Sequence, residues 1–196
     1  IVSAPMNERE LRNLMYTAQL DTTKNPIVIR YPRGEGVIAD CQKDNMAVKY
    51  PFEEIQIGKG RKLKDGKEIA ILSFGHVGNF AAAAIRDVKA DGINAAHYDM
   101  RFAKPLDEEM LHEVFANYNK VITIEDGTIK GGFGSAILEF MSEHNYKADV
   151  QIMGIPDRLV EHGTPKQLYE EIGLDANHIA QALRDIIAIN VEQLIK

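Results

Sequence analysis

The chain has 196 residues, of which 45% are hydrophobic and 27% are charged, and these are ordinary proportions for a globular protein. Its 23 Lys and Arg residues against 29 Asp and Glu residues give a net charge of −6 at pH 7. Because proteins that bind nucleic acid usually carry a basic footprint, this balance argues against a nucleic-acid partner. The length fits one domain, or one domain plus a fragment.

Cysteine content and hydropathy bear on the compartment. Cys41 has no second cysteine with which to form a disulfide or a zinc pair, so we expect a loop thiol in a reducing, cytoplasmic protein. No stretch approaches the roughly 20 apolar residues of a membrane helix, and the first residues do not resemble a signal peptide, so we expect no membrane association. The start at Ile1, without an initiator methionine, suggests a piece of a longer polypeptide.

The first fifty residues predict one helix, one strand and a linker. Asn7, with Glu10 three residues later, fits a capping box, and apolar residues then recur at helical spacing, which predicts a helix at about 7–20. Residues 27–31 predict a short buried strand. The polar stretch 34–52 has glycines and many charges without periodicity, and we expect it to be a linker.

From about residue 53 onward, predicted strands and helices alternate. The expected strands lie at 53–57, 69–74, 94–99, 120–125 and 150–154, and residues 59–65 are expected to enter a hairpin that turns at 64–67. The expected helices contain residues 80–88, follow a cap at Asp107, cover about 133–144, follow a cap at Thr164, and follow a start at Asp175. This order predicts an α/β fold with a mainly parallel sheet covered by helices on both faces.

The segment Arg30-Tyr31-Pro32-Arg33-Gly34 ends the first strand with a cationic turn. Pro32 removes a backbone donor and stops the ladder, whereas the second arginine, Arg33, has no evident structural need. A guanidinium can donate two parallel hydrogen bonds to a phosphate or a carboxylate. Arg33 is therefore the candidate contact for an anion, and the alternative is a surface ion pair with Glu35 or Asp40.

Two other segments have the position of a ligand site. The glycine-rich loop 131–135 precedes a helix, where a phosphate could bind, but it lacks a dinucleotide fingerprint and a P-loop lysine, so close helix packing explains it better. Glu125 and Asp126 end a strand, and adjacent strand residues point to opposite faces, so they cannot act as one acid/base pair. We expect them to be solvated or to cap a helix.

Arg101 and two histidines complete the candidates. Arg101 follows a strand, and we expect it to bridge to a neighbouring segment or subunit. His76 and His162, each in a loop beside a glycine, have the best case for function among the histidines, although an ordinary surface or hydrogen-bonding role is the more frequent one. No histidine spacing fits a metal site, and no serine triad can be assembled.

Several segments together resemble the 1-deoxy-D-xylulose-5-phosphate synthase family, which is thiamine-diphosphate-dependent and part of the transketolase superfamily. The segments are Tyr31-Pro32-Arg33-Gly34, Ile57-Gly58-Lys59-Gly60, Asp99 to Asp107, Gly131 to Ser135 and Gly154 to Gly163. In order and spacing they are similar to the C-terminal third of that family. The resemblance implies that residues 1–50 end a pyrimidine-binding domain and that 51–196 form a three-layer transketolase C-terminal domain.

The resemblance also implies an activity. Enzymes of this family condense pyruvate with glyceraldehyde 3-phosphate to 1-deoxy-D-xylulose 5-phosphate and carbon dioxide, which feeds isoprenoid, thiamine and pyridoxal phosphate synthesis. They use thiamine diphosphate and Mg²⁺ and act as homodimers. The matching arginine, Arg33, would hold the aldehyde's phosphate. The catalytic, cofactor-binding and metal-binding residues of the family would all precede Ile1, so the chain alone is expected to be inactive.

Two alternatives stay open at this point. The β subunit of a 2-oxoacid dehydrogenase has a final domain of the same architecture, although the segment 154–163 disfavours it. A non-catalytic assembly module, which only holds subunits together, is the other alternative.

Overall fold

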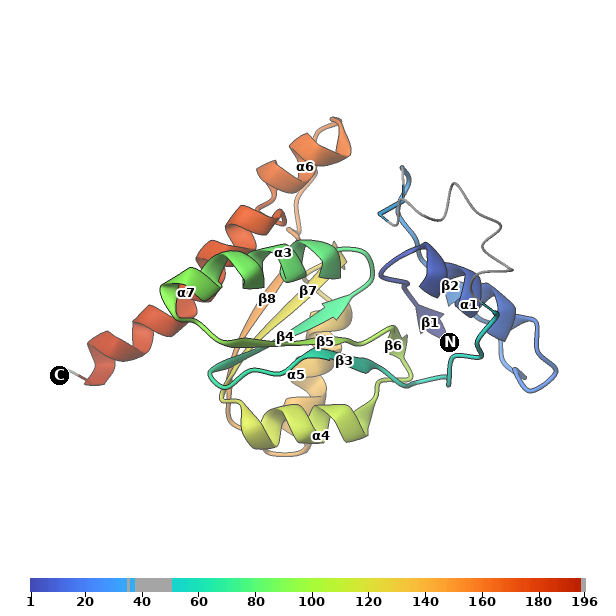
Figure 1. Cartoon of the computed structure of the whole chain (residues 1–196), viewed down its shortest axis with the longest axis horizontal. Coiled ribbons are helices and arrows are strands. Elements are labelled where there is room, and N and C mark those ends of the chain that lie inside the picture. The colour runs from blue at the N-terminus through green and yellow to red at the C-terminus, as the bar shows by residue number, and fades with distance from the viewer. Residues whose placement is uncertain (35, 38–50, 195–196) are drawn as a thin grey trace.

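The computed structural model describes residues 1–34, 36–37 and 51–194, with side chains to residue 188 (Figure 1). Cys41, Glu35, Asp40 and most of the expected linker lie outside these ranges. In chain order the elements are β1 (Val2–Ser3), α1 (Glu8–Ala18), β2 (Val28–Ile29), β3 (Arg61–Lys64), β4 (Ile69–Phe74), α3 (Gly78–Val88), the 3-10 turn η2 (Lys89–Asp91), β5 (Ala95–Asp99), β6 (Phe102–Lys104), α4 (Glu108–Asn117), β7 (Lys120–Thr128), α5 (Phe133–Glu143), β8 (Asp149–Ile155), α6 (Pro165–Glu171) and α7 (Ala176–Leu194).

A five-stranded sheet forms the centre of the domain, in the order β3-β5-β4-β7-β8. The pairs β4·β5, β4·β7 and β7·β8 are parallel, and only β3 runs antiparallel to its neighbour β5. Helices α3 and α7 cover one face, and α4 and α5 cover the other (Figure 1). The expected three-layer α/β architecture with a mainly parallel sheet is confirmed.

The central strand β4 shows why the sheet is covered on both faces. All six of its residues are buried. Ile69 and Ile71 pack into the core under α3 and α7, whereas Ala70 and Leu72 pack into the core on the side of α4 and α5. Successive side chains of a strand point to opposite faces, so an unbroken apolar run requires an apolar layer on each side.

A second sheet joins the first thirty residues to the domain. Its order is β2-β1-β6, with β1 parallel to β2 and antiparallel to β6. Beside it, the backbone N–H of Ala4 donates to the carbonyl of Arg101 at 2.9 Å. Leu14 of α1 and Phe102 of β6, both fully buried, share a small core with Ile55. The N-terminal segment, residues 1–34 and 36–37, is thus packed directly onto the domain that contains the five-stranded sheet.

The strand expected at 53–57 is wrong. These residues form neither helix nor strand, because the side chains of α1 satisfy their backbone instead of a neighbouring strand. The N–H of Ile55 donates to Thr17 Oγ1 at 2.8 Å, and the N–H of Glu53 donates to Asn13 Oδ1 at 3.3 Å. Only Ile55 is buried in this stretch. The apolar residues of 53–57 therefore belong to an irregular segment that is hydrogen-bonded to α1.

Two further strand predictions are corrected. β3 is a strand, but it pairs with β5 and not with β4, so residues 64–67 do not close a hairpin. The strand expected as buried at 27–31 is β2, a two-residue edge strand in which Val28 is 55% exposed. In both cases the identity of the neighbouring strand, which local sequence does not encode, decides the outcome.

The predicted helix starts are confirmed, with one difference. Asp107 caps α4, and Thr164 forms a capping box with Gln167 at the start of α6. Asn7 Oδ1 accepts from the N–H of Glu10 at 3.0 Å, but the Glu10 carboxylate does not return to the backbone of Asn7. It binds two arginines of the domain instead, so the predicted capping box is only half formed.

No helix within residues 1–34, 36–37 and 51–194 combines the length and the apolar character needed to cross a bilayer.

Candidate functional site

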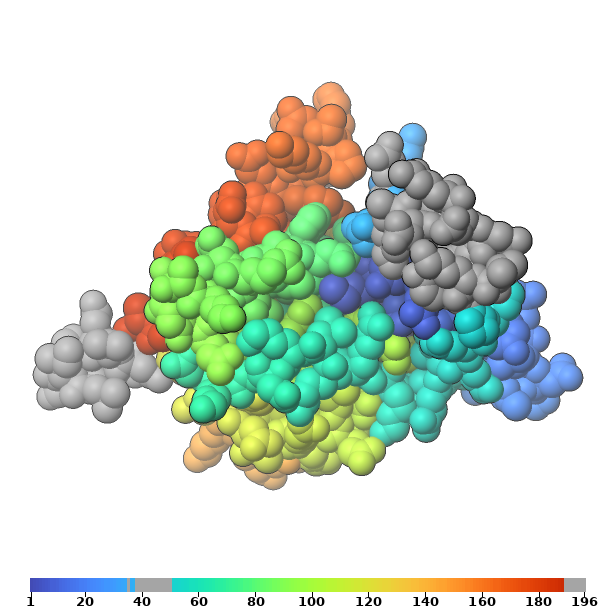
Figure 2. Space-filling model, in the orientation of Figure 1, coloured from blue at the N-terminus to red at the C-terminus, as the bar shows by residue number. Residues whose placement is uncertain are grey.

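A cleft of about 520 Å³ lies between the N-terminal segment and the domain. Met6, Leu11 and Arg33 belong to one wall. His76 at the start of α3 and Tyr169 of α6 belong to the other. The surface is hollowed between α6, in orange, and the light-blue residues of the N-terminal segment (Figure 2).

The cleft opens at a topological switch point of the sheet. The chain leaves β4 through α3 to reach β5 on one side, and it leaves β7 through α5 to reach β8 on the other. Neighbouring parallel strands whose connections depart in opposite directions leave a crevice beyond their carboxyl ends, where ligands bind in open α/β sheets. His76 follows β4 and Asp126 lies near the end of β7, so both occupy this crevice.

The N-terminal segment reaches into the same crevice. Gly75 turns the chain after β4 with φ +85°, and a Cβ placed on it would lie 3.0 Å from the Cβ of Ala4. The amide of Asn79 donates to the carbonyl of Met6 and to that of His76, each at 2.8 Å. The two walls of the cleft are therefore held in contact at its base.

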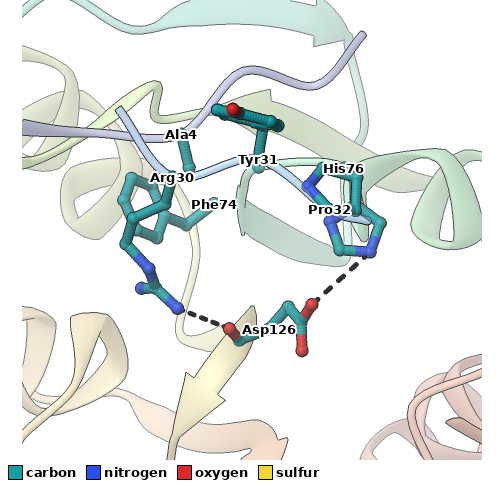
Figure 3. Close-up of a pocket in the computed structure, with 8 residues that line it drawn as sticks. Ala4, Arg30, Tyr31, Pro32, Phe74, His76 and Asp126 are labelled. Atoms are coloured by element: carbon teal, nitrogen blue, oxygen red, sulfur yellow. Dashed lines mark hydrogen bonds and ion pairs between the residues drawn. The ribbon is translucent and has the colours of Figure 1, made fainter. Parts of the chain in front are cut away.

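Arg33 extends from the N-terminal segment into the cleft and is exposed. No residue of the part of the chain that the structure describes forms a hydrogen bond or an ion pair with its guanidinium. Arg30, the first arginine of the same segment, differs. Its Nη2 donates to the backbone carbonyl of Asp126 at 2.6 Å, and its guanidinium carbon lies 5.8 Å from the centre of the Phe74 ring (Figure 3). Arg30 thus has a structural role, whereas the Arg33 guanidinium has no partner among the described residues.

His76, Tyr169 and Asp126 form a hydrogen-bonded group on the domain wall of the cleft. His76 Nε2 lies 2.8 Å from the Tyr169 hydroxyl, which donates to Asp126 Oδ2 at 3.0 Å. His76 Nε2 is also 3.7 Å from that carboxylate oxygen, and the ring points toward Asp126 in Figure 3. Three elements, β4–α3, β7 and α6, are thereby linked around one polar centre.

Burial determines the protonation states of this group. It lowers the pKa of His76, against the opposing effect of Asp126 and with the help of the Arg30 charge, so the ring is neutral near pH 7. Burial, together with the adjacent Asp126 carboxylate, raises the pKa of Tyr169 well above its usual value. Tyr169 therefore remains a hydroxyl group that can donate.

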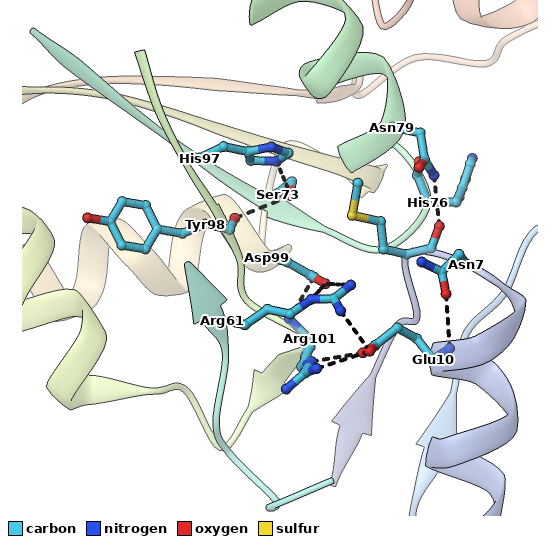
Figure 4. A network of polar contacts seen from close by, with 11 residues as sticks. Asn7, Glu10, Arg61, Ser73, His76, Asn79, His97, Tyr98, Asp99 and Arg101 are labelled. Carbon is cyan, nitrogen blue, oxygen red and sulfur yellow. Dashed lines mark hydrogen bonds and ion pairs between the residues drawn. The ribbon is translucent and has the colours of Figure 1, made fainter. Parts of the chain in front are cut away.

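A buried cluster of charges fixes the N-terminal segment to the domain (Figure 4). Glu10 of α1 is 5% exposed. Its carboxylate accepts from Arg101 Nε at 2.8 Å and Arg101 Nη2 at 3.0 Å, and from Arg61 Nη1 at 2.9 Å. Arg61 Nε in turn donates to Asp99 Oδ2 at 3.0 Å. Two carboxylates and two guanidinium groups balance each other, which a buried charge cluster requires.

Asp99 is the most deeply buried member of this cluster, with no solvent exposure. Burial raises its pKa to about 6, although Arg61 and Arg101 act in the opposite direction. The Arg61 guanidinium, 3.0 Å away, favours the charged form of Asp99, but the loss of all contact with water has the larger effect on its pKa.

The other predicted candidates have structural contacts. The prediction that Arg101 bridges to a neighbouring segment is confirmed by its two bonds to Glu10; its φ of +56° aims the side chain there. His162 is exposed in the loop before α6 and does not line the cleft. Among the described residues, no group of three His, Cys, Asp or Glu side chains is placed to hold a metal ion.

The glycine-rich loop serves packing. Glu125 Oε1 accepts from the N–H of Gly134 at 3.0 Å, so a carboxylate already occupies the N-terminus of α5 where a phosphate would bind. A Cβ on Gly134 would approach Ile152 to 2.6 Å, and one on Gly132 would approach the carbonyl of Thr128 to 2.2 Å. The helix-capping role expected for Glu125 is confirmed, whereas Asp126 accepts a hydrogen bond from Tyr169.

Sequence reasoning missed two residues of this region. Tyr169 lies inside a short helix with no motif around it, and nothing local distinguishes it. For Glu10 the sequence predicts only a role in the helix cap, which its position also fits. It indicates His76 and Asp126 separately, and the rule that carboxyl ends of neighbouring parallel strands meet is the signal that could place them together.

Comparison with known proteins identifies the family. Residues 58–179 match the sequence profile described as "Transketolase, C-terminal domain". The chain belongs to this family. A solved structure described as "Split gene transketolase, inactive beta4 tetramer" matches with a TM-score of 0.75 and 27% identity, over 95% of this chain and 56% of that one.

Several curated relatives of this transketolase-family chain share one name. Proteins named 1-deoxy-D-xylulose-5-phosphate synthase from Cytophaga hutchinsonii and Bacteroides thetaiotaomicron are each 54% identical, over 96% and 93% of the chain. The protein of that name from Vibrio campbellii is 39% identical over 96%. The chain spans only 29%, 27% and 28% of the length of these relatives.

Replacement of Glu10 tests the charge cluster. Glu10→Ala leaves Arg61 and Arg101 without their shared partner, and we expect the free energy of unfolding to fall by about 2–4 kcal/mol, since removing one partner of a buried pair is strongly destabilising. Glu171→Ala is the matched control, because its pair with Arg158 is exposed on both sides and should contribute less than about 1 kcal/mol. Chemical denaturation measures both. An equal fall in the free energy of unfolding for both variants would contradict the proposed importance of the Glu10 cluster.

The raised pKa of Asp99 predicts a pH dependence of stability. The folded protein holds the Asp99 proton more tightly than the unfolded chain, so this contribution to stability is complete below about pH 4 and is lost as the pH rises through about 6. Relative to Asp99→Asn, the free energy of unfolding of the unmodified protein should therefore fall by about 2–3 kcal/mol between about pH 4 and pH 7. Parallel stability curves for the two proteins would show that Asp99 ionises normally.

Proposed function

We propose that this chain is the C-terminal part of a thiamine-diphosphate-dependent synthase. The enzyme condenses pyruvate with glyceraldehyde 3-phosphate to 1-deoxy-D-xylulose 5-phosphate and carbon dioxide, a precursor for isoprenoids, thiamine and pyridoxal phosphate. The observation that carries the proposal is the 54% identity, over nearly the whole chain, to proteins named for this reaction. The cleft at the switch point supports it, because its wall holds the Arg33 guanidinium, which has no partner among the described residues.

Arg33 is the residue that we assign to substrate. The aldehyde substrate carries a phosphate, and a guanidinium without a described protein partner can donate two charge-assisted hydrogen bonds to it. The cleft of about 520 Å³ is large enough for a triose phosphate. Arg33 acts by binding and orienting the aldehyde, and the bond-forming step belongs to the cofactor.

We assign residues 1–50 to the end of a pyrimidine-binding domain and residues 51–196 to the transketolase C-terminal domain. Thiamine diphosphate and Mg²⁺ belong to the remainder of the enzyme. Within the described residues no metal-ligating group of three side chains occurs, and Glu125 fills the one glycine-rich helix terminus that could have received a diphosphate. We further propose a cytoplasmic homodimer.

The chain by itself should lack activity, because thiamine chemistry requires groups that hold and activate the cofactor. The similar split-gene transketolase structure is described as an inactive tetramer of its β chain. We expect the purified chain, mixed with pyruvate, glyceraldehyde 3-phosphate, thiamine diphosphate and Mg²⁺, to release no carbon dioxide above background. Release of carbon dioxide at a catalytic rate would contradict the proposal that the cofactor-binding groups lie in the remainder of the enzyme. Addition of the missing domains is the positive control.

Replacement of Arg33 in the complete enzyme tests the phosphate contact. Hydrogen bonds to a charged group contribute about 1.5–3 kcal/mol, so Arg33→Ala should raise the KM for glyceraldehyde 3-phosphate by about 10- to 100-fold. The phosphate-free acceptor D-glyceraldehyde should be affected little. Steady-state kinetics with both acceptors measures the difference.

The matched control for this experiment is Arg158→Ala. Arg158 is also an exposed arginine of the domain, but it pairs with Glu171 and does not line the cleft. It should leave both KM values unchanged. If Arg33→Ala changes the KM for neither acceptor, the chain acts here as an assembly module and does not bind the phosphate.

A further inference from the structure

The cleft holds His76, of which only one ring nitrogen, Nε2, has a hydrogen-bond partner among the described residues. Tyr169 has a single hydroxyl proton, and it donates this proton to Asp126 Oδ2 at 3.0 Å. The contact of 2.8 Å between His76 Nε2 and the same hydroxyl therefore requires Nε2 to carry the donated proton. In the neutral ring this leaves Nδ1 with a lone pair, so Nδ1 is a hydrogen-bond acceptor.

Nothing described in the protein uses that acceptor. Across residues 1–34, 36–37 and 51–194 no hydrogen bond reaches His76 Nδ1. The side chain is 17% exposed and lines the same cleft as Arg33. The charged groups that face the ring are Asp126 of β7 and Arg30 of the N-terminal segment, and burial keeps the ring neutral against the pull of the Asp126 carboxylate.

The imidazole is held in place before any ligand arrives. Its ring centre lies 5.7 Å from that of Tyr169 and 6.2 Å from that of Phe80, and the Phe80 and Tyr169 rings lie 5.3 Å apart. Figure 3 shows the ring beside Pro32 and directed toward Asp126. A group locked by its neighbours loses little conformational freedom on binding, which is the arrangement expected of a ligand-contacting side chain.

His97 of β5, which is 2% exposed and whose Nε2 bonds to Ser73 Oγ, is enclosed by the core. His76 instead lies at the switch point between β4 and β7, where the fold leaves space for a ligand.

We propose that His76 Nδ1 accepts a hydrogen bond from a hydroxyl group of the phosphorylated ligand whose phosphate Arg33 holds. This inference rests on the proposed function and deepens it, because the ligand class becomes a hydroxylated phosphate ester gripped at two points. Arg33 on the N-terminal wall recognises the anion, and His76 on the domain wall recognises the hydroxyl. Tyr169 and Asp126 are positioning residues that hold the imidazole and assign its tautomer.

The test compares two aldehyde acceptors in the complete enzyme. Glyceraldehyde 3-phosphate carries a 2-hydroxyl group, and its 2-deoxy analogue, 3-oxopropyl phosphate, carries the phosphate alone. His76→Ala should lower kcat/KM for glyceraldehyde 3-phosphate by about three- to tenfold, the range for one neutral hydrogen bond, and should leave the deoxy analogue within about twofold. An equal loss with both acceptors, or no loss with either, overturns the proposal.

Three further variants keep the result interpretable. His76→Asn keeps a hydrogen-bond-accepting oxygen near the place of Nδ1, so it should restore part of the preference for glyceraldehyde 3-phosphate over its deoxy analogue. Tyr169→Phe keeps the ring packing but removes the hydroxyl that orients His76, and it should give a smaller loss that is again confined to glyceraldehyde 3-phosphate. His162→Ala, at an exposed loop position outside the cleft, should change neither acceptor. If His76→Ala does not fold, the first two variants decide.

The outcomes also separate this inference from the proposed function. An unmodified complete enzyme that fails to use pyruvate and glyceraldehyde 3-phosphate contradicts the function itself. An active enzyme in which Arg33→Ala discriminates against phosphate, while the variants at 76 and 169 do not discriminate against the hydroxyl, contradicts only the role of His76.

Discussion

The carboxylate of Glu10 is the contact on which the arrangement of this protein depends. Glu10 lies in the first turn of α1, where its carboxylate could have capped its own helix. It binds Arg61 and Arg101 of the domain instead, and so connects the N-terminal segment to the domain. Because burying a charge is costly unless it is matched, the N-terminal segment can dock in only one position, the one that brings acid to base. The small β2-β1-β6 sheet then extends across the same boundary.

This docking creates the cleft. The N-terminal segment lies over the carboxyl ends of β4 and β7, where the opposite courses of α3 and α5 have already left a crevice. Ala4 packs against Gly75, and Asn79 bonds to the backbone of Met6, so the base of the crevice is closed while its mouth stays open toward Arg33. A site built in this way needs both regions, and neither contains it alone.

The charged and polar groups around the crevice are of two kinds: those bonded to other protein groups, and those without such a bond among the described residues. Glu125 and Arg30, each a plausible ligand group by sequence position, are engaged by α5 and by the backbone of Asp126. Arg33 and one nitrogen of His76 have no such engagement within the described residues. Side chains that are held in position yet keep hydrogen-bonding capacity toward a cavity are the ones that a ligand can use, and this separates them from the arginines and carboxylates that hold the fold together.

Local sequence predicts the α/β class, the parallel core strands, the caps at Asp107 and Thr164, and the candidacy of Arg33, because periodicity, capping and turn chemistry are local properties. The order of its motifs also indicates the family. The pairing of β3 with β5, the attachment of residues 53–57 to α1, the contacts of Glu10 with two arginines and the contact between Tyr169 and His76 become evident only in the folded chain. These features depend on contacts between residues far apart in the chain. The free energy of such a contact depends on which side chains the fold buries together, and a short stretch of sequence does not contain that information.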